Sequence, residues 1–271
     1  MGIEIQTNTS SLNAQRNLYR TNRSLNTNFQ RHSSGFRINN AGDDAAGLII
    51  SNQLSSQIVS LNIGIRNAND GISIAQTAEG ALQEVTNVLL RSRELALSAA
   101  SGQNSSTTRA AINAEFQALG EEVSRIAAQT EFGGQPLLAA ETTIDIQIGT
   151  DSGQSISVVT PNVTDIGTAI SAENVLTADN ASTALGVIDA QLAAVDTARA
   201  GLGSSQNRLS STISNLLNVT ENVAASRSQI RDSDFAAETS NSAKNKILQQ
   251  AGLAILGQAN ISNQAVLSLL K

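Results

Sequence analysis

Apolar residues recur at alternating steps of three and four along the second half of the chain. Stepping in this way from Leu185 to Ile230 visits fourteen positions, and ten of them are Leu, Ile or Val. A sustained spacing of this kind puts one apolar stripe on one side of a helix and is typical of helices that pack as a coiled coil. The pattern therefore predicts one long helix over residues 185–230.

A second stripe runs through the first half of the chain and predicts another long helix. Its start is indicated by Asp43 and Asp44, which can cap free helix amides; adjacent helix positions point in different directions, so we do not interpret the two carboxylates as a catalytic pair. A shorter helix is expected to fold back over residues 112–126 and to end at Gly133–Pro136. The long stripe consists of Leu54, Ile58, Leu61, Ile65, Ala68, Ile72, Ala75, Leu82, Leu89 and Ala96, with Glu79, Thr86 and Arg93 as gaps.

The period changes to two near residue 142. Ile144, Ile146 and Ile148 alternate with polar residues, a turn follows at residues 150–153, and Ile156 and Val158 alternate again. This is the pattern of a β-hairpin at about 142–160. Residues 160–183 are expected to form turns and short irregular structure. The predicted fold is mainly α, a long coiled-coil-like bundle formed by the N- and C-terminal halves with a small β-hairpin element in the middle of the chain.

Both ends of the chain carry weaker apolar stripes, which are too poor in apolar residues to hold a helix alone. We expect these segments to need partners and to form assembly surfaces. The candidate assembly residues are Leu12, Leu18, Leu25 and Phe29 near the N-terminus, with His32 and Phe36 continuing the stripe, and Ile247, Ala251, Ile255, Val266 and Leu270 near the C-terminus.

Composition and charge narrow the classes of function. The net charge of −6 argues against nucleic-acid binding, although the first 40 residues carry five arginines against one glutamate. No apolar run is long enough to cross a bilayer, and the N-terminus lacks the pattern of a cleaved signal. The chain has no cysteine, and its single histidine, His32, has no evident metal-binding or catalytic partners. We therefore expect no enzyme activity, no cofactor and no metal site.

Several long motifs, in order, resemble the bacterial flagellin family over both ends and most of the chain. The resemblance implies three regions: an inner-core helix over 1–44 that pairs with the C-terminus, a helical bundle over 45–231, and a C-terminal inner-core helix over 232–271. It also implies a short form without large outer domains, in which His32 and Phe36 replace the usual leucines. The motifs are SLNAQRNLYR (11–20), SSGFRINNAGDDAAGLIISNQL (33–54), RNANDGISIAQTAEGAL (66–82), RSRELALSAASG (91–102), IQIGTDSGQSISV (146–158), RSQIRDSDFAAETSNSAKNKILQQAGLAILGQAN (227–260) and VLSLLK (266–271).

The same resemblance implies a function and a set of partners. A flagellin polymerises with other flagellin subunits into an extracellular filament for swimming motility, and is exported by the flagellar type III route. Implied partners are hook-associated and cap proteins and an export chaperone. Arg91, Leu95 and Glu115 match positions that contact the animal Toll-like receptor for flagellin, or they serve helix packing. Two alternatives remain: a hook-associated junction protein, and a secreted coiled-coil effector or adhesin.

Overall fold

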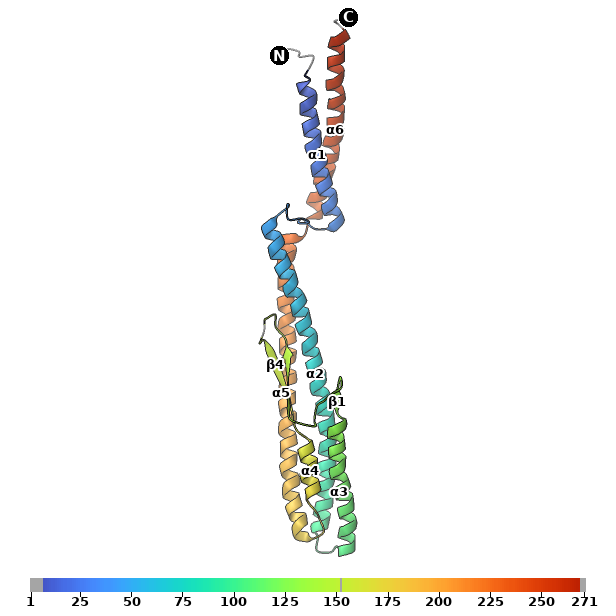
Figure 1. Cartoon of the computed structure of the whole chain (residues 1–271), viewed down its shortest axis with the longest axis vertical. Helices are drawn as coiled ribbons and strands as arrows, with labels where there is room; N and C mark the ends of the chain where they lie inside the picture. The colour runs from blue at the N-terminus through green and yellow to red at the C-terminus, as the bar shows by residue number, and fades with distance from the viewer. Residues whose placement is uncertain (1–6, 152, 269–271) are drawn as a thin grey trace. The chain divides into compact units, whose positions relative to one another are not determined.

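The computed structural model describes residues 7–151 and 153–268, which form helices and short strands (Figure 1). The chain divides into two compact units. Unit 1 is Met1–Ser56 with Asn222–Lys271, and unit 2 is Gln57–Glu221. The elements are α1 (Thr9–Ser34), α2 (Ala45–Ala100), α3 (Ser106–Gln129), β1 (Glu131–Phe132), β2 (Gln135–Pro136), β3 (Thr142–Gln147), β4 (Ser155–Thr160), α4 (Thr164–Ala172), α5 (Ala178–Arg231) and α6 (Phe235–Ser268).

The core of unit 2 follows the predicted long stripes. On α5, residues at heptad spacing are fully or almost fully buried, and α2 contributes residues of its own stripe to the same core. This confirms the two long helices and the faces that they bury, because only the stripe side of each helix is apolar enough to leave water. The buried stripe residues include Ile188, Val195, Leu202 and Leu209 on α5 and Ala68, Ala75, Leu82, Leu89 and Ala96 on α2.

Polar residues that interrupt the two stripes interact with each other across unit 2. Oε2 of Glu79 on α2 accepts a hydrogen bond of 2.9 Å from Nε2 of Gln206 on α5, and the guanidinium of Arg199 lies 4.0 Å from the same carboxylate. Nearer the α2–α3 turn, Nε of Arg93 donates to Asp189 at 2.8 Å. Glu79, Arg93 and Gln206, which are gaps in the apolar pattern, therefore each have a hydrogen-bond partner on the other long helix.

Helix α4 corrects the expectation that residues 160–183 form only turns and irregular structure. Ile166 and Ile170 lie one turn apart and both are buried against the core, so tertiary packing stabilises a helix of only nine residues. Gly167 lies directly beside Ser124 of α3, and Gly120 of α3 lies beside Ser171 of α4. These small residues let the two helix backbones approach closely.

The β-hairpin is confirmed, with Ile144 paired to Val158 and Ile146 to Ile156 in an antiparallel register. Its β3 strand is attached to α2, because Nδ2 of Asn67 donates to the carbonyl of Gln147 at 2.8 Å. The predicted end of the preceding helix is too late. Helix α3 ends at Gln129, and residues 131–136 form the small β1–β2 hairpin, whose turn is made by two glycines with φ of 59° and 81°.

The predicted start of α2 is confirmed, and the two aspartates that precede it have separate tasks. Oδ1 of Asp44 accepts the backbone N–H of Gly47 at 2.9 Å and so caps the helix. Oδ2 of Asp43 accepts the backbone N–H groups of Asn39 and Asn40, at 3.1 Å and 3.0 Å. Asp43 thus closes the turn that leads into α2.

Candidate assembly surface on the terminal helices

Helices α1 and α6 lie side by side and run antiparallel (Figure 1). At one end, Nδ2 of Asn8 donates to the carbonyl of Ala259 at 3.0 Å, and at the other the His32 ring packs edge-on against Phe235 with 4.7 Å between centroids. Between them, Nε2 of Gln249 donates to Asn22 at 2.7 Å. The two ends of the chain therefore pair within unit 1.

The seam between the two helices has heptad spacing but few large apolar residues. On α1 the residues that share this spacing are buried or half-buried, and Ala14 and Leu25 are the buried hydrophobic residues of that helix. On α6 the least exposed residues within 235–261 are mostly polar or small. The α1 positions are Ser11, Ala14, Leu18, Thr21, Leu25, Asn28 and His32; the α6 positions are Glu238, Ser242, Asn245, Gln249, Gly252, Leu256 and Ala259.

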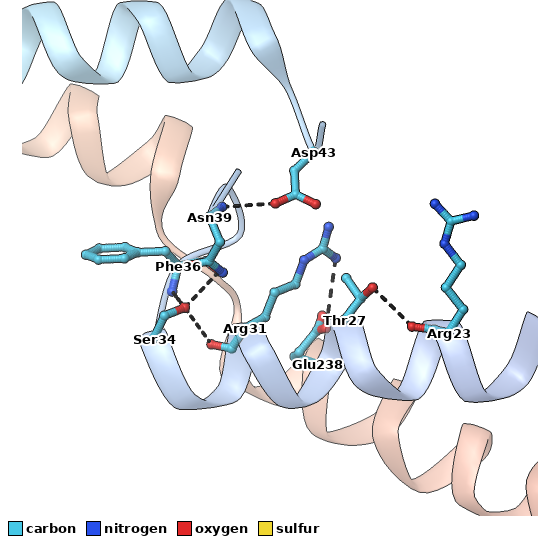
Figure 2. Close-up of polar contacts among 8 residues, drawn as sticks. All are labelled: Arg23, Thr27, Arg31, Ser34, Phe36, Asn39, Asp43 and Glu238. Atoms are coloured by element: carbon cyan, nitrogen blue, oxygen red, sulfur yellow. Dashed lines mark hydrogen bonds and ion pairs between the residues drawn. The ribbon is translucent and has the colours of Figure 1, made fainter. Parts of the chain in front are cut away.

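A polar network lies at one end of this seam. With its amide oriented to satisfy its neighbours, Nδ2 of Asn28 donates to Oε1 of Glu238 at 2.9 Å, and its oxygen accepts from Nδ2 of Asn245 at 3.0 Å and from the backbone N–H of Ser242 at 3.3 Å. Figure 2 shows Arg31 reaching from α1 toward Glu238, with 3.9 Å between the charged groups. Asn28 and Glu238 are each only 7% exposed, so the network is a buried one.

The segments that follow α1 and precede α6 are joined by backbone hydrogen bonds. The N–H of Arg37 donates to the carbonyl of Arg231 at 2.7 Å, and the N–H of Ser233 donates to that of Gly35 at 3.0 Å. The guanidinium of Arg231 lies over the Phe36 ring, 4.3 Å from its centroid. Phe36 and His32 therefore both have specific partners in this structure.

The turn after α1 holds a charged carboxylate. Hydrogen bonds from the backbone N–H of Asn40 and then of Asn39 lower the pKa of Asp43 below its ordinary value, and the positive charge of Arg31 acts in the same direction. Figure 2 shows Asp43 beside Asn39 in this turn, with Asn39 also close to Phe36 and Ser34. The ionised form of Asp43 thus stabilises the loop between α1 and α2.

The candidate assembly residues fall on different sides of the two helices. Leu25 is buried in the seam and Leu18 is half-buried there. By contrast Leu12, Phe29 and Ala251 are exposed, and Ile247 and Ile255 are 65% and 60% exposed. The side chain of Val266 and the whole of Leu270 lie outside the described residues.

Further exposed apolar residues on these helices were not predicted. Tyr19 on α1 is 71% exposed, and α6 exposes several more large apolar side chains. The sequence could have indicated these exposed residues. The positions at heptad spacing that form the seam are mostly polar or small, so the remaining apolar residues of α1 and α6 must lie on other faces. Those on α6 are Phe235, Leu248, Leu253 and Ile261.

The three candidate receptor residues lie in unit 2 and differ in exposure. The guanidinium of Arg91 on α2 donates to Glu115 on α3 at 2.8 Å and to Glu94 at 3.0 Å, and these carboxylates raise its pKa. Leu95, by contrast, is 7% exposed and belongs to the hydrophobic core. The structure therefore brings Arg91 and Glu115 together on the surface and keeps Leu95 beneath it.

Comparisons with known proteins match nearly the whole chain. The family described as "Bacterial flagellin N-terminal helical region" matches residues 5–143, and "Bacterial flagellin C-terminal helical region" matches residues 185–270. The flagellin of Halalkalibacterium halodurans is 45% identical over 275 residues, covering 98% of this chain and 99% of the relative. The chain belongs to the bacterial flagellin family.

Two further flagellins allow the length and the fold of this chain to be compared with those of its relatives. Flagellin A of Vibrio cholerae serotype O1 is 36% identical over an alignment of 379 residues that covers 100% of both chains. That alignment is longer than this chain of 271 residues, so this chain is a short form without a large variable domain. The crystal structure of Bacillus cereus flagellin superposes with a TM-score of 0.51 at 30% identity, covering 56% of this chain and 88% of that one.

As a flagellin, the chain is a structural subunit of the bacterial flagellar filament, an extracellular structure. These matches favour the filament subunit over the hook-associated and effector interpretations. Among residues 7–151 and 153–268, no cluster of three acidic, histidine or cysteine side chains is placed to bind a metal ion. None of the described helices is long and apolar enough to span a membrane.

Proposed function

We propose that this flagellin polymerises through the outward apolar faces of α1 and α6. The observation that carries the proposal is the distribution of apolar residues in unit 1. The seam between the helices is mostly polar or small, whereas Leu12, Phe29, Ile247 and Ile255 point to solvent. Large exposed apolar patches mark interaction surfaces in soluble proteins.

The contacts needed for a filament agree with this placement. A filament requires heterologous contacts that do not close into a ring, so each subunit must offer apolar surface to several neighbours. A helix pair that buried its apolar residues in its own seam would leave little apolar surface for neighbouring subunits. Here the pair retains Tyr19, Leu248 and Leu253 as additional exposed side chains.

Residues 1–44 and 232–271 form the proposed inner-core region, and they order fully when subunits join. The described part of α1 buries only Ala14 and Leu25 as hydrophobic residues, which is little apolar area to offset the entropy of ordering two long helices. Burial of apolar surface against neighbouring subunits would supply the remaining free energy needed to order these helices. A chain that is loosely ordered at both ends would also suit export through the narrow flagellar type III route.

The remaining partners follow from the family resemblance. They are the hook-associated and cap proteins at the filament, an export chaperone, and the animal Toll-like receptor for flagellin. For the receptor, Arg91 and Glu115 are the accessible members of the candidate site, since Leu95 is buried. The proposed task is mechanical: the filament turns motor rotation into thrust for swimming, with no catalysed reaction and no cofactor.

Substitution of Ile255 tests the assembly surface. Ile255→Asp would place an unpaired carboxylate in an apolar contact, which costs several kcal/mol in each subunit, about the range for a buried unpaired polar group. We expect seeded growth from filament fragments to fail for Ile255→Asp and to proceed for the matched control Ile255→Met. Normal elongation of the Asp variant, followed by electron microscopy and sedimentation, would remove this face from the assembly contacts.

Truncation tests the wider role of the C-terminal segment. Removing residues 250–271 should abolish polymerisation and leave the thermal transition of unit 2 in place, because the core from Ala68 to Leu209 is untouched. Circular dichroism of the monomer measures the second outcome.

Limited proteolysis of wild-type monomer should remove about the first 45 and last 40 residues before it cuts the bundle, as expected for terminal segments with few buried contacts. Protection of both ends in a verified monomer would contradict ordering on assembly.

A further inference from the structure

The face that α6 turns toward α1 is the less apolar of its faces. Within residues 235–261, the side chains nearest α1 include Glu238, Asn245 and Gln249, while Ile247 and Ile255 point away. Hydrophobic burial alone would favour the opposite choice, because α1 also carries apolar side chains that an apolar face of α6 could cover. Another interaction must therefore select the observed face.

The buried network at Glu238 supplies that interaction. Its carboxylate lies 2.9 Å from the Asn28 amide and 3.9 Å from the Arg31 guanidinium, and the carboxylate side chain is only 9% exposed. Turning α6 about its axis would remove this acceptor from Arg31 and from one of the two Asn28 amide N–H groups, the other N–H being bound to the Ser24 carbonyl at 3.0 Å. Unpaired buried polar groups are strongly disfavoured, and buried polar residues are known to fix the alignment of paired helices.

We propose that Asn28, Arg31 and Glu238 determine which face of α6 pairs with α1, and so keep the apolar face of α6 free for neighbouring subunits. These are positioning residues: they act on assembly through the orientation of α6. The consequence for neighbouring subunits rests on the assembly function proposed above. The choice of face concerns the two helices of one chain, so it can be measured separately from the ability to polymerise.

Two engineered cysteine pairs can report which face of α6 lies against α1. The sequence has no cysteine, so any disulfide within a chain must join the two engineered residues. A Cβ built on Gly252 lies 4.0 Å from the Cβ of Leu18, within the range of about 3.5–4.5 Å found in disulfides. Leu18→Cys with Gly252→Cys therefore reports the observed face. Leu18→Cys with Ala254→Cys reports the turned face, because Ala254 is exposed and points about 200° away at nearly the same height along α6.

Disulfide formation is measured in subunits incorporated as a minor fraction into wild-type filaments, where the proposed ordering of the terminal helices is complete. In the otherwise wild-type chain we expect the Gly252 pair to form and the Ala254 pair to fail. Glu238→Ala should lower the ratio of the two by roughly tenfold, since it leaves one of the two buried Asn28 amide N–H groups without its acceptor. The matched variant Glu238→Gln keeps an acceptor for Asn28 and should restore the ratio.

An unchanged ratio in Glu238→Ala would overturn the proposal and assign the orientation to the backbone hydrogen bonds at residues 35–37 and 231–233. Loss of both disulfides would also overturn it, because the network would then hold the pair together without selecting a face. Failure of the assembly function is distinct. If Ile255→Asp polymerises while Glu238→Ala still exchanges one disulfide for the other, the apolar face has a different role but the selection stands.

Discussion

Gly167 of α4 faces Ser124 of α3 so closely that a Cβ on this glycine would lie 2.2 Å from the Ser124 hydroxyl oxygen. The carbonyl of Gly120 lies 3.1 Å from the same point, so the added carbon would also meet backbone. We expect Gly167→Ala to push α4 away from α3 and to lower the free energy of unfolding of unit 2 by about 1–3 kcal/mol, the usual effect of overpacking. Urea denaturation followed by circular dichroism measures this change.

Gly186→Ala is the matched control for that substitution. Gly186 lies in α5 and is exposed, and a Cβ added to it would lie in open space. Alanine at such a helical site should raise stability by roughly 0.5–1 kcal/mol. Equal effects of the two substitutions would show that helix propensity, and not the close approach of α3 and α4, governs both.

Gly64 gives a second close contact, between α2 and the end of the β3–β4 hairpin. A Cβ there would lie 2.2 Å from the carbonyl oxygen of Ile148. Gly64→Ala should displace the hairpin, weaken the bond from Asn67 to Gln147, and speed hydrogen exchange of the hairpin amides while the α2–α5 core stays protected. Gly80→Ala, on the same helix but with open space around it, should leave the exchange unchanged.

The turn at Asp43 should respond to acid. Backbone hydrogen bonds from Asn40 and Asn39 lower the pKa of Asp43 from its ordinary value of 3.8. A carboxyl with a lowered folded-state pKa contributes stability above its unfolded pKa, and that contribution is lost as pH falls through the folded value. The NMR amide shifts of Asn39 and Asn40 should therefore titrate with a midpoint below 3.8. Asp43→Asn should abolish the titration, and a midpoint above the ordinary value would contradict the role of these hydrogen bonds.

Removal of the surface pair Arg91 and Glu115 tests the receptor proposal. Arg91→Ala with Glu115→Ala should reduce Toll-like receptor signalling by the monomer and leave unit 2 folded, because both side chains are about half exposed. Arg125→Ala with Glu122→Ala removes another exposed ion pair of α3 and serves as the matched control. Unchanged signalling of the first variant at equal concentration would show that the family site does not operate here.

The sequence by itself determined the architecture wherever the buried side chains are apolar. The stripe from Leu185 to Ile230 and its counterpart on α2 predict the long helices and the faces that they bury, because no other side of these helices can leave water at low free energy. The period-two segments predict β3 and β4 for the same reason. The capping residues before α2 are local, so Asp44 could be assigned from its neighbours alone.

Only the tertiary structure decided the features that depend on partners distant in sequence. Helix α4 is too short to be predicted from periodicity and depends on Ile166 and Ile170 being buried by other elements. The apolar stripes of the terminal helices group Leu25 with Ile247 and Ile255, whereas the structure buries Leu25 in the seam and exposes Ile247 and Ile255 away from α1. Hydrophobic periodicity identifies a buried face only when that face is apolar. The α1–α6 seam is held by polar groups, and the sequence does not show that Asn28 and Glu238, more than 200 residues apart, satisfy each other.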